Sequence, residues 1–298
     1  MITVSDLVQQ IAAQFERAPL HYGHGTDNAW DEAVRLVTFQ LGLPDDQAVL
    51  AQVVSEGDSQ QVQALADARI SSRKPLAYLL GSAPYAGFEF HITEGVVIPR
   101  SPIGLALLAG ELDGWLQAPV QRVLDLCSGS GCLGILSAQY FPQAEVTLLE
   151  NDPLAQQVCA ANIERYQLSN RVTCLAADIF QPWPLDGHYD LVLANPPYVD
   201  QPDMQSLPAE YAHEPTAGLA SGADGLSHMR AILTQLPNHL TEQGLFVGEV
   251  GASGPALNQA YPKVPVVWLD LPQGGEGVFV LEGRSLLHHT APADSPAS

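Results

Sequence analysis

The hydrophobic residues near the start of the chain recur at the spacing of α-helices. A first stripe repeats every four residues, at Leu7, Ile11 and Phe15. A second advances by four, three and four residues, at Trp30, Val34, Val37 and Leu41, and a third lies within residues 59–72, at Val62, Leu65 and Ile70. Positions three and four apart share one face of a helix. The pattern therefore predicts a small helical domain over residues 1–80.

After this region the hydrophobic pattern changes to that of β-strands. Residues 85–92 and 96–98 predict a β-hairpin whose turn, Thr93-Glu94-Gly95, contains a glycine. We expect this hairpin to form a linker between two domains, over residues 81–100.

Residues 101–285 alternate short hydrophobic runs with helical stretches. Buried strands are predicted at residues 123–126, 145–150, 171–175, 189–194 and 245–250. Such alternation predicts an α/β fold, a doubly wound and mostly parallel sheet covered on both faces. Residues 264–271 and 277–281 are joined by a link too short for a crossover, so the last strand should be antiparallel. Residues 286–298 predict a disordered tail.

Length and cysteine usage set the class of protein. A chain of 298 residues is long enough for two domains. It has no hydrophobic run of membrane-spanning length, and its start lacks the basic segment of a signal peptide, so we expect a cytoplasmic protein without membrane contact. The four cysteines lack metal-binding spacing and are predicted to be reduced packing residues: Cys127, Cys132, Cys159 and Cys174.

The charge of the chain bears on its partners. The formal net charge is −21, with only 12 lysines and arginines. Binding DNA through its phosphates requires clustered cations, so we expect no DNA partner. An acidic surface favours a basic protein, whose approach it accelerates. Adaptation of a whole proteome to high salt would also produce this negative charge. The sequence does not indicate the oligomeric state.

A glycine-rich turn follows the first predicted strand of the sheet. Asp125 lies inside that strand, and Cys127-Ser128-Gly129-Ser130-Gly131 leads from it into a helix. Glycines allow the backbone to approach a ligand closely. With Gly134 and Glu150, the turn also fits the dinucleotide fingerprint. Asp125 favours S-adenosylmethionine, because its carboxylate suits the ammonium group of a methionine moiety; the alternative is an acid that caps the backbone of the turn.

Two further carboxylates end the next predicted strands. Glu150 closes residues 145–150 and could accept both ribose hydroxyl groups of a nucleoside. Asp178 follows residues 171–175 and could contact an adenine amine, or it could cap its own loop. The carboxyl ends of parallel strands form the ligand-binding edge of such sheets. We therefore expect the candidate cofactor-binding residues to lie together at the carboxyl edge of the sheet.

The turn Asn195-Pro196-Pro197-Tyr198 follows the buried strand 189–194. A planar NH2 nitrogen is a poor nucleophile because its lone pair is delocalised, so alignment must assist its reaction. The Asn195 side-chain oxygen and the Pro196 carbonyl can each accept one N–H of such a group and stabilise the charge it gains. The prolines cannot join a ladder, and the Tyr198 ring offers a flat wall. Asn195, Pro196 and Tyr198 are therefore the candidate catalytic residues, with Pro197 as a further substrate-binding residue.

These motifs together resemble the bacterial protein N(5)-glutamine methyltransferases over about residues 75–281. The resemblance also rests on Pro99-Arg100-Ser101-Pro102, on residues 210–215 (Glu-Tyr-Ala-His-Glu-Pro) and on residues 219–226 (Leu-Ala-Ser-Gly-Ala-Asp-Gly-Leu). Pro99-Arg100-Ser101-Pro102 is similar to the branch acting on ribosomal large-subunit protein L-three, since the release-factor enzymes usually carry a Pro-Glu-Thr-Glu-like run there. Glu150 stands where many relatives have Asp.

The resemblance implies a Rossmann-like fold, S-adenosylmethionine as cofactor, no metal, and a helical domain that recognises substrate. Cys127 to Gly131 would wrap the methionine end of the cofactor, Glu150 would bind ribose, and Asp178 and Ile179 would flank adenine. Asn195 would contact both the cofactor and the glutamine amide, which the segment up to Tyr198 holds. The implied partner is the basic ribosomal protein L-three.

Four other functions remain open from the sequence. Two are methyl transfers as well, to a glutamine of a peptide-chain release factor or to adenine in DNA. A third is ribosome assembly, with the helical domain binding nascent ribosomal protein and methylation incidental. The fourth is a dinucleotide-dependent oxidoreductase that uses the turn from Gly129 to Gly134.

Overall fold

The computed structural model describes residues 2–44, 46–272 and 274–286. The chain divides into two compact units. The helical unit comprises Met1–Glu94, Ile98–Arg100 and Pro208–Glu214, and the sheet unit comprises Gly95–Val97, Ser101–Leu207 and Pro215–Ser298. Of the predicted tail, residues 287–298 lie outside the described residues. No helix within the described ranges is long and apolar enough to cross a membrane.

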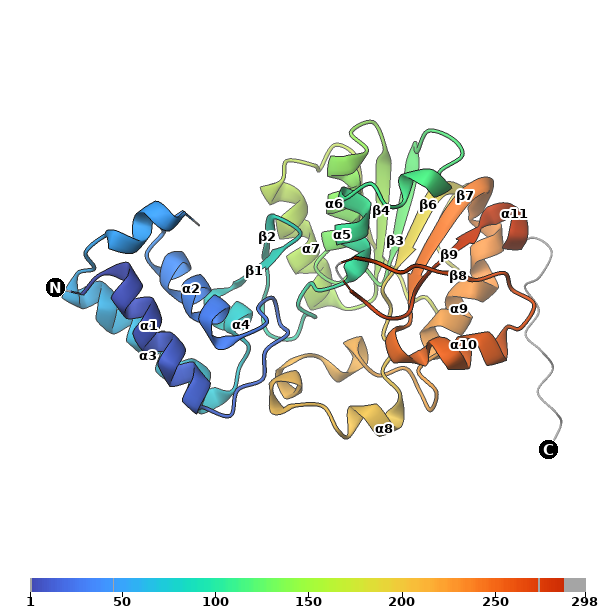
Figure 1. The fold of residues 1–298 in the computed structure, drawn as a ribbon. Helices are drawn as coiled ribbons and strands as arrows, with labels where there is room; N and C mark the ends of the chain where they lie inside the picture. The colour runs from blue at the N-terminus through green and yellow to red at the C-terminus, as the bar shows by residue number, and fades with distance from the viewer. Residues whose placement is uncertain (1, 45, 273, 287–298) are drawn as a thin grey trace. The chain divides into compact units, whose positions relative to one another are not determined.

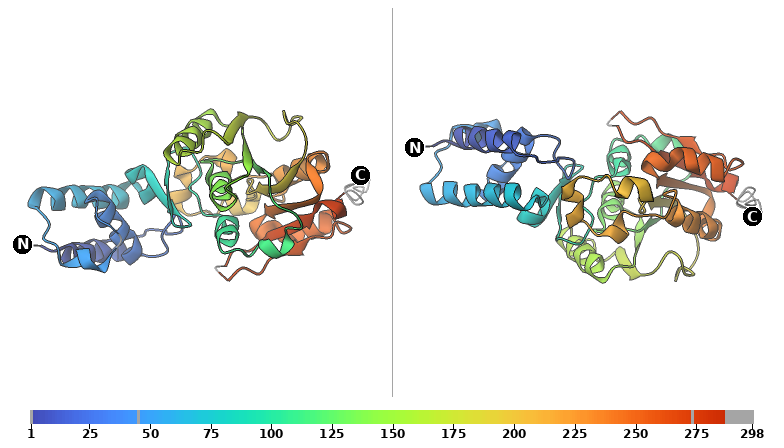
Figure 2. Two further views of the ribbon diagram at one scale, coloured as in Figure 1. Left: turned by 90° about the horizontal axis from the view of Figure 1, so that it is seen from above. Right: turned by 90° about the horizontal axis from the view of Figure 1, so that it is seen from below.

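The helical unit is built on three helices that pack side by side (Figure 1, Figure 2): α1 (Val4–Arg17), α2 (Ala29–Gln40) and α3 (Glu56–Ser72). A short 3-10 helix, η1 (Gln47–Ala51), and helix α4 (Leu76–Leu80) complete it. Each long helix begins at a side-chain cap, supplied by Thr3, Asn28 and Ser55. The three predicted helices are thus confirmed.

The stripe predicted for α2 is partly wrong. Trp30 is 46% exposed, whereas Ala33, Leu36 and Val37 are fully buried. The helix is turned so that Glu32 also faces inward, where it accepts a hydrogen bond from the buried Arg69 guanidinium at 2.7 Å. The spacing of hydrophobic residues does not predict this rotation, because a carboxylate such as that of Glu32 is expected on the solvent-exposed face of a helix.

The helical unit includes a segment that lies far away in the sequence, Pro208–Glu214. The Glu210 carboxylate is fully buried and accepts two hydrogen bonds from Arg73, at 2.6 and 2.7 Å. It also accepts the backbone N–H of His21, at 2.8 Å. Glu214 receives two bonds from Arg100, at 2.6 and 2.7 Å. Paired, hydrogen-bonded carboxylates of this kind can be buried without prohibitive cost.

The β-hairpin exists, but its predicted turn is wrong. Strands β1 (Ser82–Tyr85) and β2 (Phe88–His91) pair antiparallel around Ala86-Gly87, and both turn residues have positive φ, 50° and 78°. Two left-handed residues make the tight turn that matches the twist of a hairpin. Residues 96–98 form no strand; instead the Ile98 N–H donates to the Glu214 carboxylate at 3.0 Å.

The sheet unit contains seven strands in the order β5-β4-β3-β6-β7-β9-β8. The strands are β3 (Arg122–Leu126), β4 (Glu145–Glu150), β5 (Val172–Ala176), β6 (Tyr189–Ala194), β7 (Leu240–Glu249), β8 (Val267–Trp268) and β9 (Val278–Glu282). Neighbours from β5 to β7 are parallel, and β9 runs antiparallel to both β7 and β8. The predicted α/β sheet with an antiparallel last strand is confirmed.

Helices cover both faces of this sheet (Figure 1): α5 (Pro102–Leu108), α6 (Cys132–Tyr140) and α7 (Pro153–Arg165) on one side, α9 (Ser227–Gln235) and α10 (Gly254–Ala260) on the other. Shorter helices are η2 (Asp113–Trp115), α8 (Gln201–Met204), η3 (Ala209–His213), η4 (Thr216–Gly218), η5 (Leu236–Asn238), η6 (Gly251–Ser253) and α11 (Gly283–Leu286). Leu124 and Leu126 pack in the core beneath α9 and α10, so the alternate residue Asp125 faces α6.

The strand order locates the ligand-binding edge. From β3 the chain proceeds outward to β4 and β5, and then returns to β6 on the other side of β3. Open α/β sheets bind ligands in the crevice where the order reverses, outside the carboxyl ends of the strands. Here that place lies between the ends of β3 and β6, where Leu126 pairs with Ala194. Cys127 and Asn195 are the next residues of these two strands.

Candidate active site

The loop from Cys127 to Gly131 is held in an unusual backbone conformation. Cys127, Gly129 and Gly131 have φ of 56°, 55° and 80°. A Cβ on Gly131 would lie 2.7 Å from the Cys159 sulfur, so only glycine fits the start of α6. Gly129 has open space around its Cα. A left-handed non-glycine residue such as Cys127 carries strain, which concentrates at functional sites.

Asp125 is buried beneath this loop. Its side chain is 1% exposed, and its Oδ2 atom accepts the Gly134 N–H at 2.9 Å, so it does cap the start of α6. Its Oδ1 atom is buried without a hydrogen-bond partner. Burial raises the pKa of Asp125 to about 8, against the opposing hydrogen bond from Gly134. The free oxygen has the capacity to accept a further hydrogen bond.

Glu150 connects the ends of β3 and β4. Its Oε2 atom accepts the Gly129 N–H at 2.7 Å, and its Oε1 atom accepts the Asp152 N–H at 2.8 Å. Burial raises its pKa. Each carboxylate oxygen can accept a second hydrogen bond, so capacity remains for hydroxyl groups. Asp152 itself caps α7 through the N–H groups of Leu154 and Ala155.

The residues after β5 point in different directions. Asp178 accepts the Phe180 N–H at 2.9 Å and so caps its own loop. Ile179 is 5% exposed and packs in the core of the sheet unit, whereas the Phe180 ring is 51% exposed. The Phe180 ring lies 5.0 Å from the His228 ring of α9. The exposed aromatic ring at this strand end therefore belongs to Phe180, which no motif in the sequence indicates.

The turn after β6 contains the second unpartnered acceptor. The Oδ1 atom of Asn195 is buried and has no hydrogen-bond partner. Tyr198 is fixed at several points: its hydroxyl donates to Glu249 at 3.0 Å, and its carbonyl accepts from Ser253 at 3.1 Å. The turn thus presents a free side-chain oxygen next to an ordered aromatic ring.

The four cysteines are free thiols. Burial raises the pKa of Cys127 well above its ordinary value and that of Cys132 to about 12, so both stay protonated at neutral pH. Among the residues that the structure describes, no group of three or more His, Cys, Asp or Glu side chains is placed to hold a metal ion.

Comparison with known proteins identifies the family. Residues 102–217 match the model of the methyltransferase small domain. The chain is 40% identical to the ribosomal protein uL3 glutamine methyltransferase of Bordetella pertussis, over 95% of this chain and 96% of that protein. It is 39% identical to the enzyme of the same name from Neisseria gonorrhoeae, over 96% of both chains. The chain belongs to the ribosomal protein uL3 glutamine methyltransferases.

The fold, the enzyme class and the cofactor predicted from the sequence are therefore confirmed for this member of the uL3 glutamine methyltransferases. Among solved structures, the hMettl16 catalytic domain in complex with MAT2A 3′UTR hairpin 6 is similar, with a TM-score of 0.53, 15% identity, and 90% of this chain and 96% of that chain covered. At this identity the likeness concerns the fold alone.

The site of this uL3 glutamine methyltransferase family member fits S-adenosylmethionine. The unpartnered Asp125 Oδ1 suits the ammonium group, the open space at Gly129 admits a ligand next to the backbone, and Glu150 has acceptor capacity for ribose. The predicted cofactor-binding residues come from the ends of adjacent strands, β3, β4, β5 and β6. Their individual roles remain predictions.

Glu249 is a further functional candidate that the sequence pattern does not single out. It is the last residue of β7, 4% exposed, and it accepts hydrogen bonds from Tyr198 and, at 2.6 Å, from the Ser101 hydroxyl. The one sign in the sequence is its position: Glu249 is a carboxylate at the carboxyl end of the hydrophobic strand β7, next to the ligand-binding edge.

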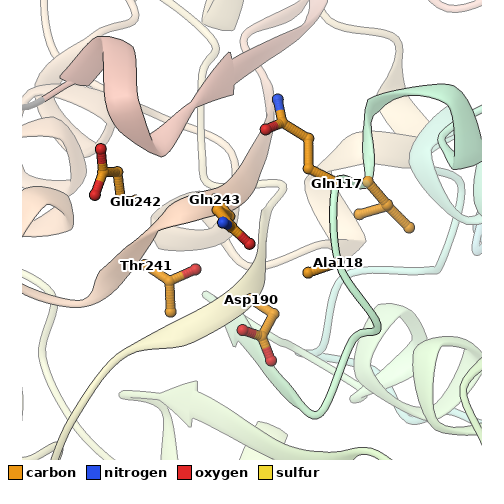
Figure 3. A pocket seen from close by; sticks show the side chains of 7 residues that line it. Gln117, Ala118, Asp190, Thr241, Glu242 and Gln243 are labelled. Carbon is orange, nitrogen blue, oxygen red and sulfur yellow. The ribbon is translucent and has the colours of Figure 1, made fainter.

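A separate pocket lies at the opposite edge of the sheet (Figure 3). It has a volume of about 340 Å³ and is lined by residues at the start of β7, by Asp190 of β6 and by the loop before β3: Leu116, Gln117, Ala118, Asp190, Thr241, Glu242 and Gln243. The Asp190 carboxylate there accepts the N–H groups of Gln121 and Arg122, at 2.9 and 3.0 Å. This pocket lies at the strand starts, away from the ligand-binding edge.

Proposed function

We propose that this protein transfers a methyl group from S-adenosylmethionine to the side-chain amide nitrogen of a glutamine in ribosomal protein uL3, the large-subunit protein L-three. The observation that supports this most is a pair of buried, unpartnered acceptors: Asp125 Oδ1 in β3, and Asn195 Oδ1 directly after the neighbouring strand β6. One suits an ammonium group and the other an amide NH2. Because uL3 belongs to the ribosome, the proposed location is the cytoplasm.

The chain's own residues supply alignment and electrostatics. Asn195 accepts one N–H of the glutamine amide and the Pro196 carbonyl accepts the other, so the nitrogen lone pair is aimed and its developing positive charge is stabilised. The Tyr198 ring flanks the amide, while Pro197 keeps the backbone extended. When bound, S-adenosylmethionine supplies an electrophilic methyl group. The surplus amide proton leaves to water after transfer, so a dedicated base is not required.

The charge distribution supports a basic protein substrate. Two of the arginines are paired with carboxylates, which reduces their attraction for an anion: Arg73 with Glu210, and Arg230 with Asp224. A chain with a net charge of −21 repels nucleic acid and attracts a cationic ribosomal protein. DNA adenine is therefore a poor acceptor candidate.

The function can be tested on purified uL3. After incubation with the enzyme and S-adenosylmethionine, intact-mass measurement and peptide mapping should find one added methyl group on one glutamine side chain. A peptide-chain release factor and an adenine-containing DNA duplex serve as competing acceptors. Faster modification of either one would show that the assigned substrate is wrong.

Phe180 extends the proposed adenine site. Because Ile179 is buried in the core while Phe180 is exposed next to it, we propose that the Phe180 ring, with Asp178, flanks adenine. Base stacking on an aromatic ring contributes about 1–3 kcal/mol. Phe180→Ala should therefore weaken S-adenosylhomocysteine binding about 10-fold in calorimetry, while Phe180→Trp retains it. Equal affinity of Phe180→Ala and the wild type would exclude this role.

A further inference from the structure

Glu249 joins two motifs that lie far apart in the sequence. Its Oε2 atom accepts the hydroxyl of Ser101, the N-cap of α5, and its Oε1 atom accepts the hydroxyl of Tyr198. Glu249 is 4% exposed and Ser101 is 2% exposed. Burying a carboxylate is costly unless hydrogen bonds compensate, and these two charge-assisted bonds do so. The carboxylate therefore holds both hydroxyl groups in fixed places.

The Tyr198 ring is confined on its other sides as well. A Cβ on Gly251 would lie 2.6 Å from the Tyr198 ring, so the ring packs directly on the backbone just after β7. A Cβ on Gly225 would lie 2.3 Å from the Tyr198 carbonyl, which also accepts the Ser253 hydroxyl. These contacts fix the backbone and one edge of the ring. The bond to Glu249 fixes its far end.

We propose that Glu249 is a positioning residue for methyl transfer, which acts by holding the Tyr198 ring at the acceptor amide. The inference rests on the proposed function for the role of Tyr198. β6 and β7 are parallel neighbours, with Ala194 opposite Gly248, so Glu249 and Asn195 occupy equivalent places at their strand ends. A ring anchored from β7 then forms one wall of a site whose acceptor, Asn195, comes from β6. A misplacement of about 1 Å in such a site can cost roughly 100-fold in rate.

The first test is kinetic and uses the full-length enzyme with uL3. Glu249→Ala should lower kcat by about 10- to 100-fold, with KM for uL3 and the Kd of S-adenosylhomocysteine within about threefold of wild type. Glu249→Gln should recover most of the lost turnover, since an amide can accept the Tyr198 hydroxyl and donate to Ser101. Glu242→Ala, at the exposed start of the same strand, is the matched control.

A double variant tests whether Glu249 acts through Tyr198. Tyr198→Phe removes the hydroxyl but keeps the ring, and it should lower kcat to a similar degree. If both side chains act as one unit, Glu249→Ala combined with Tyr198→Phe is no slower than the poorer single variant. Fully additive losses, or wild-type kcat in Glu249→Ala, would overturn the inference.

A spectroscopic readout separates this inference from the proposed function. With 3-fluorotyrosine incorporated, the 19F resonance of Tyr198 is assigned by its absence in Tyr198→Phe. In the complex with S-adenosylhomocysteine, it should shift and broaden in Glu249→Ala and keep its wild-type position in Glu249→Gln. An unchanged resonance in Glu249→Ala shows that Glu249 does not position the ring. Failure of the wild type to methylate uL3 contradicts the proposed function, and the 19F spectra still decide the role of Glu249.

Discussion

Replacing Asn195 with alanine should lower methyl transfer to uL3 by roughly 100- to 1,000-fold, the usual effect of removing one group that stabilises developing charge. The affinity for S-adenosylhomocysteine should stay within a few fold of wild type, because Asp125 and Glu150 lie on other strands. The buried Asn195 Oδ1 has no partner within the protein, so its loss leaves no internal donor unsatisfied. Turnover under saturating cofactor and calorimetry measure the two quantities separately.

A control variant and an assay of ribosome assembly complete the test of Asn195. Asn238→Ala, at an exposed asparagine of the same unit, should behave like the wild type. Wild-type turnover by Asn195→Ala would refute the assigned acceptor role. If the inactive variant still supported ribosome assembly in cells, the helical domain would act as an assembly factor independent of methylation.

The sequence predicts the ligand-binding edge well because its signals are local. Strands β3 and β6 are mostly hydrophobic, as expected for strands buried on both faces, with Arg122, Asp125 and Asp190 as the exceptions. A turn that contains glycine follows β3, and a turn that contains proline follows β6. Gly131 is required by the nearby Cys159 sulfur and by its φ of 80°. Proline and glycine after a hydrophobic run therefore predict the loops that follow these two strands and carry the candidate site.

Contacts between distant segments could not be predicted in this way. Glu249 meets Ser101 and Tyr198 across 148 and 51 positions of the chain. Glu210 joins Arg73 across 137 positions, which places Pro208–Glu214 in the helical unit. A carboxylate in a sequence gives no sign of its eventual partner. Tertiary charge pairing also turns α2, so that Glu32 is buried and Trp30 is exposed.

The two carboxylates of the candidate cofactor site differ in how many hydrogen bonds they can still accept from a ligand. Both oxygens of Glu150 already accept backbone N–H groups, whereas Asp125 keeps one oxygen free. The Asp125 pKa of about 8 follows from burial without a cation. An ammonium group bound there would stabilise the ionised form and lower this pKa. Cofactor binding should therefore release a proton, which calorimetry in buffers of different ionisation enthalpy can measure.

The sign of the pH dependence follows from this pKa. The pKa of Asp125 is raised in the folded protein, so the unfolded chain loses this proton first as pH rises. Its contribution to the free energy of unfolding is thus largest below the ordinary aspartate pKa and declines up to pH of about 8. Affinity for an ammonium ligand changes in the opposite sense and increases as pH approaches 8, since only the ionised carboxylate attracts it.

Asp125→Asn should weaken S-adenosylhomocysteine binding about 10- to 100-fold at pH 8, because a hydrogen bond to a charged group contributes about 1.5–3 kcal/mol. The asparagine oxygen can still accept the Gly134 N–H, so the loop keeps its cap. The variant should also lose the rise of affinity between pH 6 and 8 and the proton release, while its unfolding midpoint becomes less sensitive to pH. Glu145→Gln, an exposed carboxylate of β4, is the control. Wild-type affinity and pH dependence in Asp125→Asn would show that Asp125 only caps α6 and that the ammonium group binds elsewhere.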